Sequence, residues 1–189
     1  SAAVAPLAEV IQSDNGGIRG YAAAVLGEIG DPAGGAACLA LSNDSDPGVQ
    51  AKAARAASKL GASGSASDAY VGLGNRFYDK DLGLRRDFTT SRNLWRWKDG
   101  DLARMTVPFY LYGYQMAEEC ASDALSADNG NSAAGALLVR SILAQKIEAD
   151  MRGDDAPASL KGSFALAQSL GFQAATDGLR ASLDGKDWD

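Results

Sequence analysis

One helical phrase occurs twice in this chain, with its second copy 31 residues after the first. Residues 18–30 read IRGYAAAVLGEIG and align with residues 49–61, which read VQAKAARAASKLG. The segments in front of them also correspond, since 4–15 aligns with 34–45. A period near 30 with two helices per unit is typical of stacked helical hairpins, in which each hairpin buries its apolar face only against its neighbours. The sequence therefore predicts an all-α fold, an α-α superhelix in the form of a solenoid.

Apolar residues at helical spacing, bounded by turn residues, predict where the helices lie. Gly30 stands where a helix ends, and Asp31-Pro32 is an N-cap followed by proline in the first turn. The helices are expected at about 3–12, 18–29, 32–41, 49–60, 69–78, 110–125, 133–150, 159–170 and 172–183.

Two segments interrupt the helical pattern. Residues 61–68 are rich in Gly, Ser and Ala, a linker composition. They divide the chain into 1–62 and 68–189, although one continuous solenoid is equally compatible. Residues 79–108 lack a clean period and predict a long inserted loop, and loops of that length are usually functional or disordered.

Because the chain opens without Met inside what reads as the second helix of a repeat, we expect a fragment of a longer protein.

The repeats resemble a known family. GEIGDPA at 27–33, DPGV at 46–49 and the following A-x-x-A-A-x-x-L-G are similar to the short bacterial HEAT-like repeat, a type that also occurs in bilin lyases. Residues 69–150 resemble a degenerate tetratricopeptide-like segment, and 165–171 return to HEAT-like phrasing. The resemblance implies a right-handed solenoid that binds a protein or peptide, and it names no partner.

Charge and composition weigh against several functions. The net charge is −6, whereas nucleic acids and anionic membranes attract basic surfaces. Residues 76–104 are locally cationic, with eight basic and five acidic side chains. The chain has no histidine, the usual general base and a common metal ligand. Since catalytic and metal-binding motifs are also missing, we expect no enzyme activity, no metal and no cofactor.

Cys38 and Cys120 are expected to be buried thiols, and a disulfide or a reactive thiol is the alternative.

The segment 92–98, with the sequence RNLWRWK, is the leading candidate binding site. In an extended strand Trp95 and Trp97 point to one side and Arg96 to the other. Tryptophan and arginine dominate binding hot spots, so the segment predicts a recognition patch. The alternative is that Leu94 and the two indoles anchor a long loop to the body of the protein, because burying each contributes about 2–3 kcal/mol.

Tyr110 and Tyr114 share one face of a predicted helix. They predict either a shelf for a ligand or aromatic packing between hairpins. The full set of candidate binding residues is Arg92, Trp95, Arg96, Trp97, Tyr110 and Tyr114.

A non-catalytic scaffold for protein–protein interaction is the leading hypothesis for function. A HEAT-like enzyme is the first alternative, either a bilin lyase or an alkyl-base DNA glycosylase that would use Trp95, Arg96, Trp97 and Asp99. A structural spacer within a larger protein is the second. No run approaches the ~20 apolar residues of a membrane span. The compartment stays open, cytoplasmic or exported as part of a longer chain.

Overall fold

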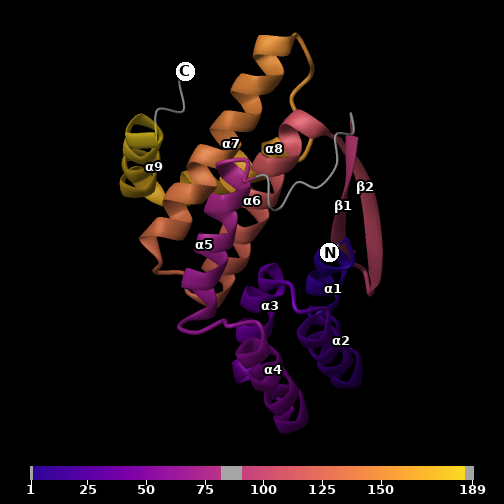
Figure 1. Ribbon diagram of the computed structural model, residues 1–189. Coiled ribbons are helices and arrows are strands. Elements are labelled where there is room, and N and C mark those ends of the chain that lie inside the picture. Colours follow the sequence, from indigo (N-terminus) through magenta and orange to yellow (C-terminus); the bar gives the residue numbers. More distant parts are fainter. Residues whose placement is uncertain (1, 82–90, 186–189) are drawn as a thin grey trace. The chain divides into compact units, whose positions relative to one another are not determined.

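The computed structural model describes residues 2–81 and 91–185 (Figure 1). These residues form two compact units that interleave along the chain. The first unit contains the residues up to Tyr70 together with Asn93–Val107, and the second contains Val71 to Arg92 and the residues from Pro108 onward. Residues 93–107, which belong to the predicted segment 68–189, are thus part of the first unit.

The first unit is built from short helices, some of which begin at a side-chain cap. They are α1 (Val4–Val10), α2 (Gly16–Ile29), α3 (Gly35–Ala40) and α4 (Pro47–Lys59), followed by the start of α5 (Ala66–Tyr78). Asn15, Asp31 and Asp46 each accept a hydrogen bond from a backbone N–H in the first turn that follows. These caps satisfy N–H groups that have no partner inside the helix, which is why the chain turns at these residues.

The helix predicted at 32–41 is broken into three pieces. The 3-10 turns η1 (Pro32–Gly34) and η2 (Leu41–Asn43) bracket α3. A Cβ atom at Gly34 would lie 3.1 Å from Leu26 Cδ2, and one at Gly35 would lie 2.7 Å from Ala62 Cβ. The glycine pair thus lets the backbone approach its neighbours closely, and it lowers the helix propensity of this segment.

Small side chains bring α2 and α4 together. A Cβ atom at Gly27 on α2 would lie 2.9 Å from the Cβ of Ala56 on α4. Leu26, which is 1% exposed, lies in a core in which alanine is the commonest residue. The high alanine content of the sequence therefore serves close helix packing.

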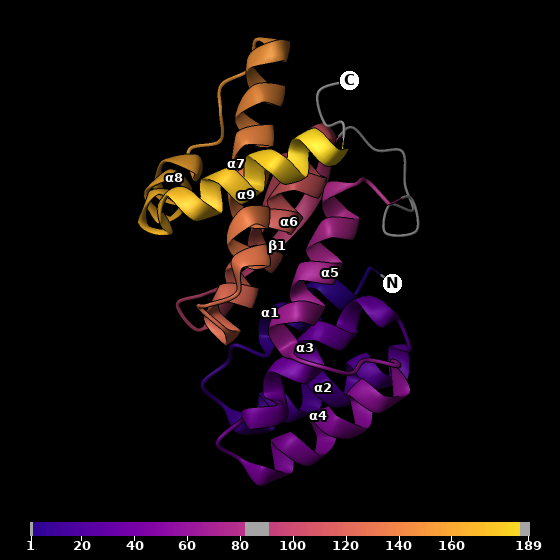
Figure 2. The same ribbon diagram turned by 90° about the vertical axis from the view of Figure 1, so that its left-hand side faces the viewer.

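The second unit contains longer helices. After the rest of α5 come α6 (Phe109–Ala127), α7 (Ser132–Arg152), α8 (Leu160–Ser169) and α9 (Gly171–Gly185). α7 packs against α6 and α9, and α9 lies across it (Figure 2). A Cβ atom at Gly74 on α5 would lie 2.6 Å from Leu137 Cδ2 and 3.0 Å from Cys120 Cβ. Glycine is therefore required where α5, α6 and α7 meet.

The prediction of a long loop is wrong over the second half of 79–108. Residues 91–108 form a β-hairpin of β1 (Ser91–Lys98) and β2 (Asp101–Pro108), joined by Asp99 and Gly100. The φ angles of these two residues are +53° and +81°, as in the type I′ turn that favours Asp-Gly. The first part of the predicted loop, 82–90, lies outside the described residues.

The fold is mostly helical and consistent with a helical solenoid, with the two-stranded sheet as the exception to the all-α prediction. The right-handed superhelix stays a prediction. Within residues 2–81 and 91–185, no helix combines the length and the apolar character needed to cross a membrane.

Candidate functional site

The hairpin holds four of the six predicted site residues, Arg92, Trp95, Arg96 and Trp97. Because its turn has two residues, Trp97 lies opposite Leu102 and Trp95 lies opposite Arg104. Residues that lie opposite each other in an antiparallel pair share a face of the sheet. The two indoles, one aliphatic side chain and one guanidinium therefore share one face of the hairpin.

The other face anchors the hairpin. Leu94 is 1% exposed and Val107 is 6% exposed. Trp95, Arg96 and Trp97 are half-buried, so they keep part of their surface accessible. Leu94 is thus the buried anchor of β1, and the indoles can still contact a partner.

The outer edge of β1 is covered. The backbone N–H of Trp97 donates to Glu9 Oε2 on α1 at 2.9 Å, and Glu9 itself is 7% exposed. Arg96 Nη1 donates to the backbone oxygen of Trp95 at 2.9 Å. Trp97 belongs to a pair that does not hydrogen-bond across the hairpin, so its N–H points away from β2. β1 therefore offers no open edge at this point.

The outer edge of β2 is different. Its first outward N–H, that of Leu102, donates to Asp101 Oδ1 at 2.7 Å. By the alternation of the ladder, the N–H groups of Arg104 and Thr106 point outward from the same edge. Within the described part of the chain, no group accepts a hydrogen bond from either of them. Both residues are exposed, and Figure 1 shows β2 as the outer strand of the hairpin. The structure thus contains an open strand edge, which is a template for pairing with another chain.

The hairpin is cationic in an acidic protein. It carries four basic side chains, Arg92, Arg96, Lys98 and Arg104, and two acidic ones, Asp99 and Asp101. Arg104, on the face of the indoles, lies beside the open edge.

Three of the six predicted residues lie in the second unit: Arg92, at the start of β1, and Tyr110 and Tyr114 on α6. The guanidinium of Arg92 lies over two rings, 5.6 Å from the centroid of Phe109 and 5.2 Å from that of Tyr112. Burial raises the pKa of the Tyr112 hydroxyl, and the positive charge of Arg92 partly opposes this shift. Arg92 therefore packs on aromatic rings at the start of α6.

The two tyrosines have different surroundings. Tyr114 is 9% exposed, and its ring meets the ring of Tyr78 edge-on with centroids 5.2 Å apart. Tyr110 donates from its hydroxyl to Asp154, and Arg152 lies 4.3 Å from its ring centroid. The hydrogen bond to the Asp154 carboxylate is the main reason that the pKa of Tyr110 is raised. Tyr114 offers little surface to a partner, and a binding role for either tyrosine stays a prediction.

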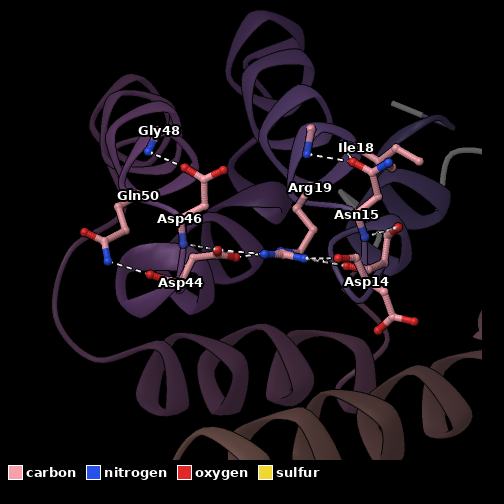
Figure 3. A network of polar contacts seen from close by, with 10 residues as sticks. Asp14, Asn15, Ile18, Arg19, Asp44, Asp46, Gly48 and Gln50 are labelled. Carbon is pink, nitrogen blue, oxygen red and sulfur yellow. Dashed lines mark hydrogen bonds and ion pairs between the residues drawn. The ribbon is translucent and has the colours of Figure 1, made fainter.

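The sequence analysis missed a polar network between the first two repeats (Figure 3). Arg19 on α2 donates from Nε and Nη2 to the two carboxylate oxygens of Asp44, at 2.6 and 2.7 Å. Its Nη1 also donates to the backbone oxygens of Ser13 and Asp14, at 2.8 and 3.0 Å. One guanidinium thus joins the turn before α2 to the turn before α4. The available signal was an arginine early in a helix whose neighbouring repeat has an acidic turn.

Carboxylates and thiols are side chains that could bind a metal ion or act as a nucleophile in this chain, which has no histidine. Within 2–81 and 91–185, no three Cys, Asp or Glu side chains lie close enough together to hold a metal ion. Cys38 and Cys120 are both buried thiols, as the sequence analysis expected. Burial raises the pKa of the Cys38 thiol to about 11, so this cysteine stays protonated at neutral pH and is a poor nucleophile.

Comparison with known proteins agrees with the repeat pattern. No curated protein and no solved structure matches the chain. Residues 4–87, somewhat less than half of the chain, match the family model described as HEAT repeats. The match supports a HEAT-like repeat protein.

Proposed function

We propose that this chain is a non-catalytic helical-repeat scaffold that binds an extended, acidic segment of a protein partner along the edge of β2. The observation that carries the proposal is the open edge at Arg104 and Thr106, next to a face that presents Trp95 and Trp97. HEAT-type solenoids provide extended surfaces for protein partners, which supports the scaffold role.

The edge provides the main-chain part of the recognition. A strand added to β2 can accept hydrogen bonds from the outward N–H groups of Arg104 and Thr106 and donate to their carbonyl groups. Such bonds are independent of the partner's sequence, so they supply affinity rather than specificity.

The side chains beside the edge provide the selectivity. A residue of the added strand opposite Arg104 lies on the face of the indoles, because residues opposite each other share a face. A carboxylate at that position pairs with the guanidinium, and apolar residues two positions away reach the half-buried rings of Trp95 and Trp97. The expected ligand is therefore an extended segment with an acidic or an apolar residue at every second position, so that these residues share one face of the added strand.

The test is selection from a displayed library of short random peptides, followed by affinity measurements on the enriched sequences. We compare the wild type with Thr106→Pro and Thr106→Val. Proline removes the outward N–H and blocks pairing at the edge, and it spares the ladder to β1 because this position does not bond across the hairpin. Valine keeps the N–H and the β-branched shape, and it is the matched control.

Enriched acidic peptides that lose affinity with Thr106→Pro and keep it with Thr106→Val support the proposal. Peptides that bind Thr106→Pro as well as the wild type rule out strand addition. If selection enriches nothing, the spacer hypothesis gains support. Binding of duplex DNA at low salt that Arg96→Ala abolishes would favour the DNA-binding alternative instead.

A further inference from the structure

Large exposed apolar side chains gather in one part of the second unit. Seven of them lie between residues 143 and 183, and their exposed fractions range from 42% to 85%. They are Leu143, Ile147, Met151, Leu166, Phe172, Leu179 and Leu183. Single exposed apolar residues are normal on a protein surface, but a concentration of this kind marks an interaction site.

α9 has two opposite apolar faces, and the face with the small residues is the buried one. A Cβ atom at Gly178 would lie 3.0 Å from the backbone oxygen of Ala136 and 3.2 Å from Val139 Cβ on α7. On the opposite face Phe172 is 85% exposed and Leu179 is 58% exposed. An amphipathic helix ordinarily buries its large apolar residues, but within residues 2–81 and 91–185 nothing covers the outer face of α9.

A ridge on α7 continues from under α9 into the open. Residues four apart on a helix form one ridge, and here the ridge is Gly135, Val139, Leu143, Ile147 and Met151. Its first two members pack against α9. The exposed fractions of the next three rise along the helix, from 42% through 55% to 82%. The uncovered surface is thus continuous with the packed interface between α7 and α9.

The outer face of α9 has a spacing that reads the same in both directions. Phe172, Thr176, Leu179 and Leu183 follow each other at intervals of four, three and four residues. This is the spacing of a helix that packs along another helix. An antiparallel copy of α9 therefore places Phe172 opposite Leu183 of the second copy, and Thr176 opposite Leu179. A two-fold symmetric interface requires a self-complementary surface of this kind.

The charges beside this stripe do not oppose self-association. Arg180 is the charged residue next to the stripe, and it lies 3.7 Å from Asp177 of its own helix. In the antiparallel pair it faces Gln173 of the second copy, which is neutral and already bonded to Asp177 of its own helix. No pair of like charges is brought together along the seam.

We propose that the outer face of α9, with the uncovered ridge of α7 beside it, binds a second copy of this chain through an antiparallel pair of α9 helices. Weighted by their exposed fractions, the six large apolar side chains of α7 and α9 among them present on the order of 600 Å². A standard interface buries about 800 Å² on each partner, so the surface is of the right size for a specific dimer. This surface is formed by other elements than the edge of β2, and the inference does not depend on the proposed function.

Sedimentation velocity over a series of concentrations tests the dimer. The mass of the wild type should rise from 19.5 kDa toward twice that value as concentration increases. Leu179→Asp should raise the dissociation constant more than tenfold, because it places a charge in the seam. Tyr21→Asp is the matched control, since Tyr21 is 71% exposed on α2 in the first unit, and it should associate like the wild type.

Circular dichroism checks that each variant is folded, which is expected because both substituted side chains are exposed. A wild type that stays monomeric at every concentration overturns the proposal. A dimer that Leu179→Asp leaves unchanged overturns it as well.

Cross-linking tests the antiparallel arrangement. A Phe172→Cys chain mixed with a Leu183→Cys chain should form a disulfide on oxidation, because these positions face each other. Either variant alone should not, since two copies of the same position lie about 16 Å apart along the pair. Cross-links within a single variant, without any between the two variants in the mixture, overturn the antiparallel pairing. Both native cysteines are buried and do not interfere.

Discussion

Replacing Asp44 by alanine should destabilise the first unit through the loss of one bidentate ion pair (Figure 3). The carboxylate accepts hydrogen bonds from Nε and Nη2 of Arg19 at 2.6 and 2.7 Å. Its Oδ1 also accepts the backbone N–H of Asp46 at 2.9 Å, at the start of α4. Without the carboxylate, Arg19 keeps only its bonds to the backbone oxygens of Ser13 and Asp14.

How far the ion pair is exposed decides how much the free energy of unfolding should fall in Asp44→Ala. The side chains of Arg19 and Asp44 are 14% and 6% exposed. Removing one partner of a fully buried pair costs about 3–5 kcal/mol, and a hydrogen bond to a charged group contributes about 1.5–3 kcal/mol. The guanidinium keeps two carbonyl partners and some contact with water, so its charge is not left buried without partners. We expect the free energy of unfolding to fall by about 2–3 kcal/mol.

Urea unfolding followed by circular dichroism measures this change. With a slope of about 2 kcal/mol/M, Asp44→Ala should lower the midpoint by about 1 M. Glu28→Ala is the matched control, because Glu28 pairs with Lys59 and so also links α2 to α4. Those two side chains are 75% and 54% exposed, and an exposed pair contributes less than about 1 kcal/mol. If the two variants lose the same stability, the reasoning from burial and geometry is wrong.

The pH dependence gives an independent check. The hydrogen bond from Arg19 is the main reason that the pKa of Asp44 is held below its ordinary value. A lowered pKa in the folded state contributes stability above the pKa of the unfolded chain, about 3.9 for Asp, and this stability is lost as the pH falls through the folded value. The difference between the wild type and Asp44→Ala should therefore be constant from pH 7 to about 5 and shrink below about 4. A difference that grows on acidification contradicts the assignment.

Three further predictions concern packing, the turn and a thiol. Gly27→Val places a Cβ atom 2.9 Å from the Cβ of Ala56, and the free energy of unfolding in urea should fall by about 1–3 kcal/mol. Gly72→Ala is the control, because a Cβ atom there has nothing within 4 Å, and it should be neutral or stabilise the protein by up to about 1 kcal/mol. Gly100→Ala puts a side chain at a φ of +81° and should weaken the hairpin by about 1 kcal/mol, seen as faster amide exchange in β1 and β2 with that of α7 unchanged. Cys38 should resist an aromatic disulfide reagent at pH 8 until urea unfolds the protein, and rapid reaction of the native protein would contradict its burial.

The helices could be predicted because their signals are local. Asn15, Asp31 and Asp46 cap the segments that follow them, and the sequence analysis had expected turns at these positions. A cap and an apolar period act within a few residues of each other, so a single sequence is enough to locate a helix.

The hairpin was missed although part of its signal is local. Asp99-Gly100 between extended residues is the strongest short-range indication of a two-residue turn. What the sequence could not show is the partner that holds β1 in place, since the N–H of Trp97 donates to Glu9, 88 residues earlier in the chain. Strands depend on such distant contacts more than helices do, because what favours a residue in a strand is its packing against neighbours from elsewhere. The open edge of β2 is visible only once the register is known.

The hydrogen bonds around Arg19 show that the two copies of the repeat share contacts as well as sequence. Arg19 donates to the backbone oxygen of Ser13, six residues earlier, and Gln50 donates to the backbone oxygen of Asp44, also six residues earlier. The two donors occupy equivalent positions in the two copies of the helical phrase, so each repeat closes the turn before its helix with a side chain from the first turns of that helix.

Only the first donor also reaches the next turn. The guanidinium of Arg19 has further N–H groups, which bind the carboxylate of Asp44, whereas the amide group of Gln50 is shorter and uncharged. The position 31 residues after Asp44 is Asn75, which lies within α5 rather than in a turn. This series of polar turn contacts therefore ends at the second repeat. The chain beyond it depends on other contacts, among them the cation–π contacts of Lys80 with Tyr114 and of Arg140 with Tyr78.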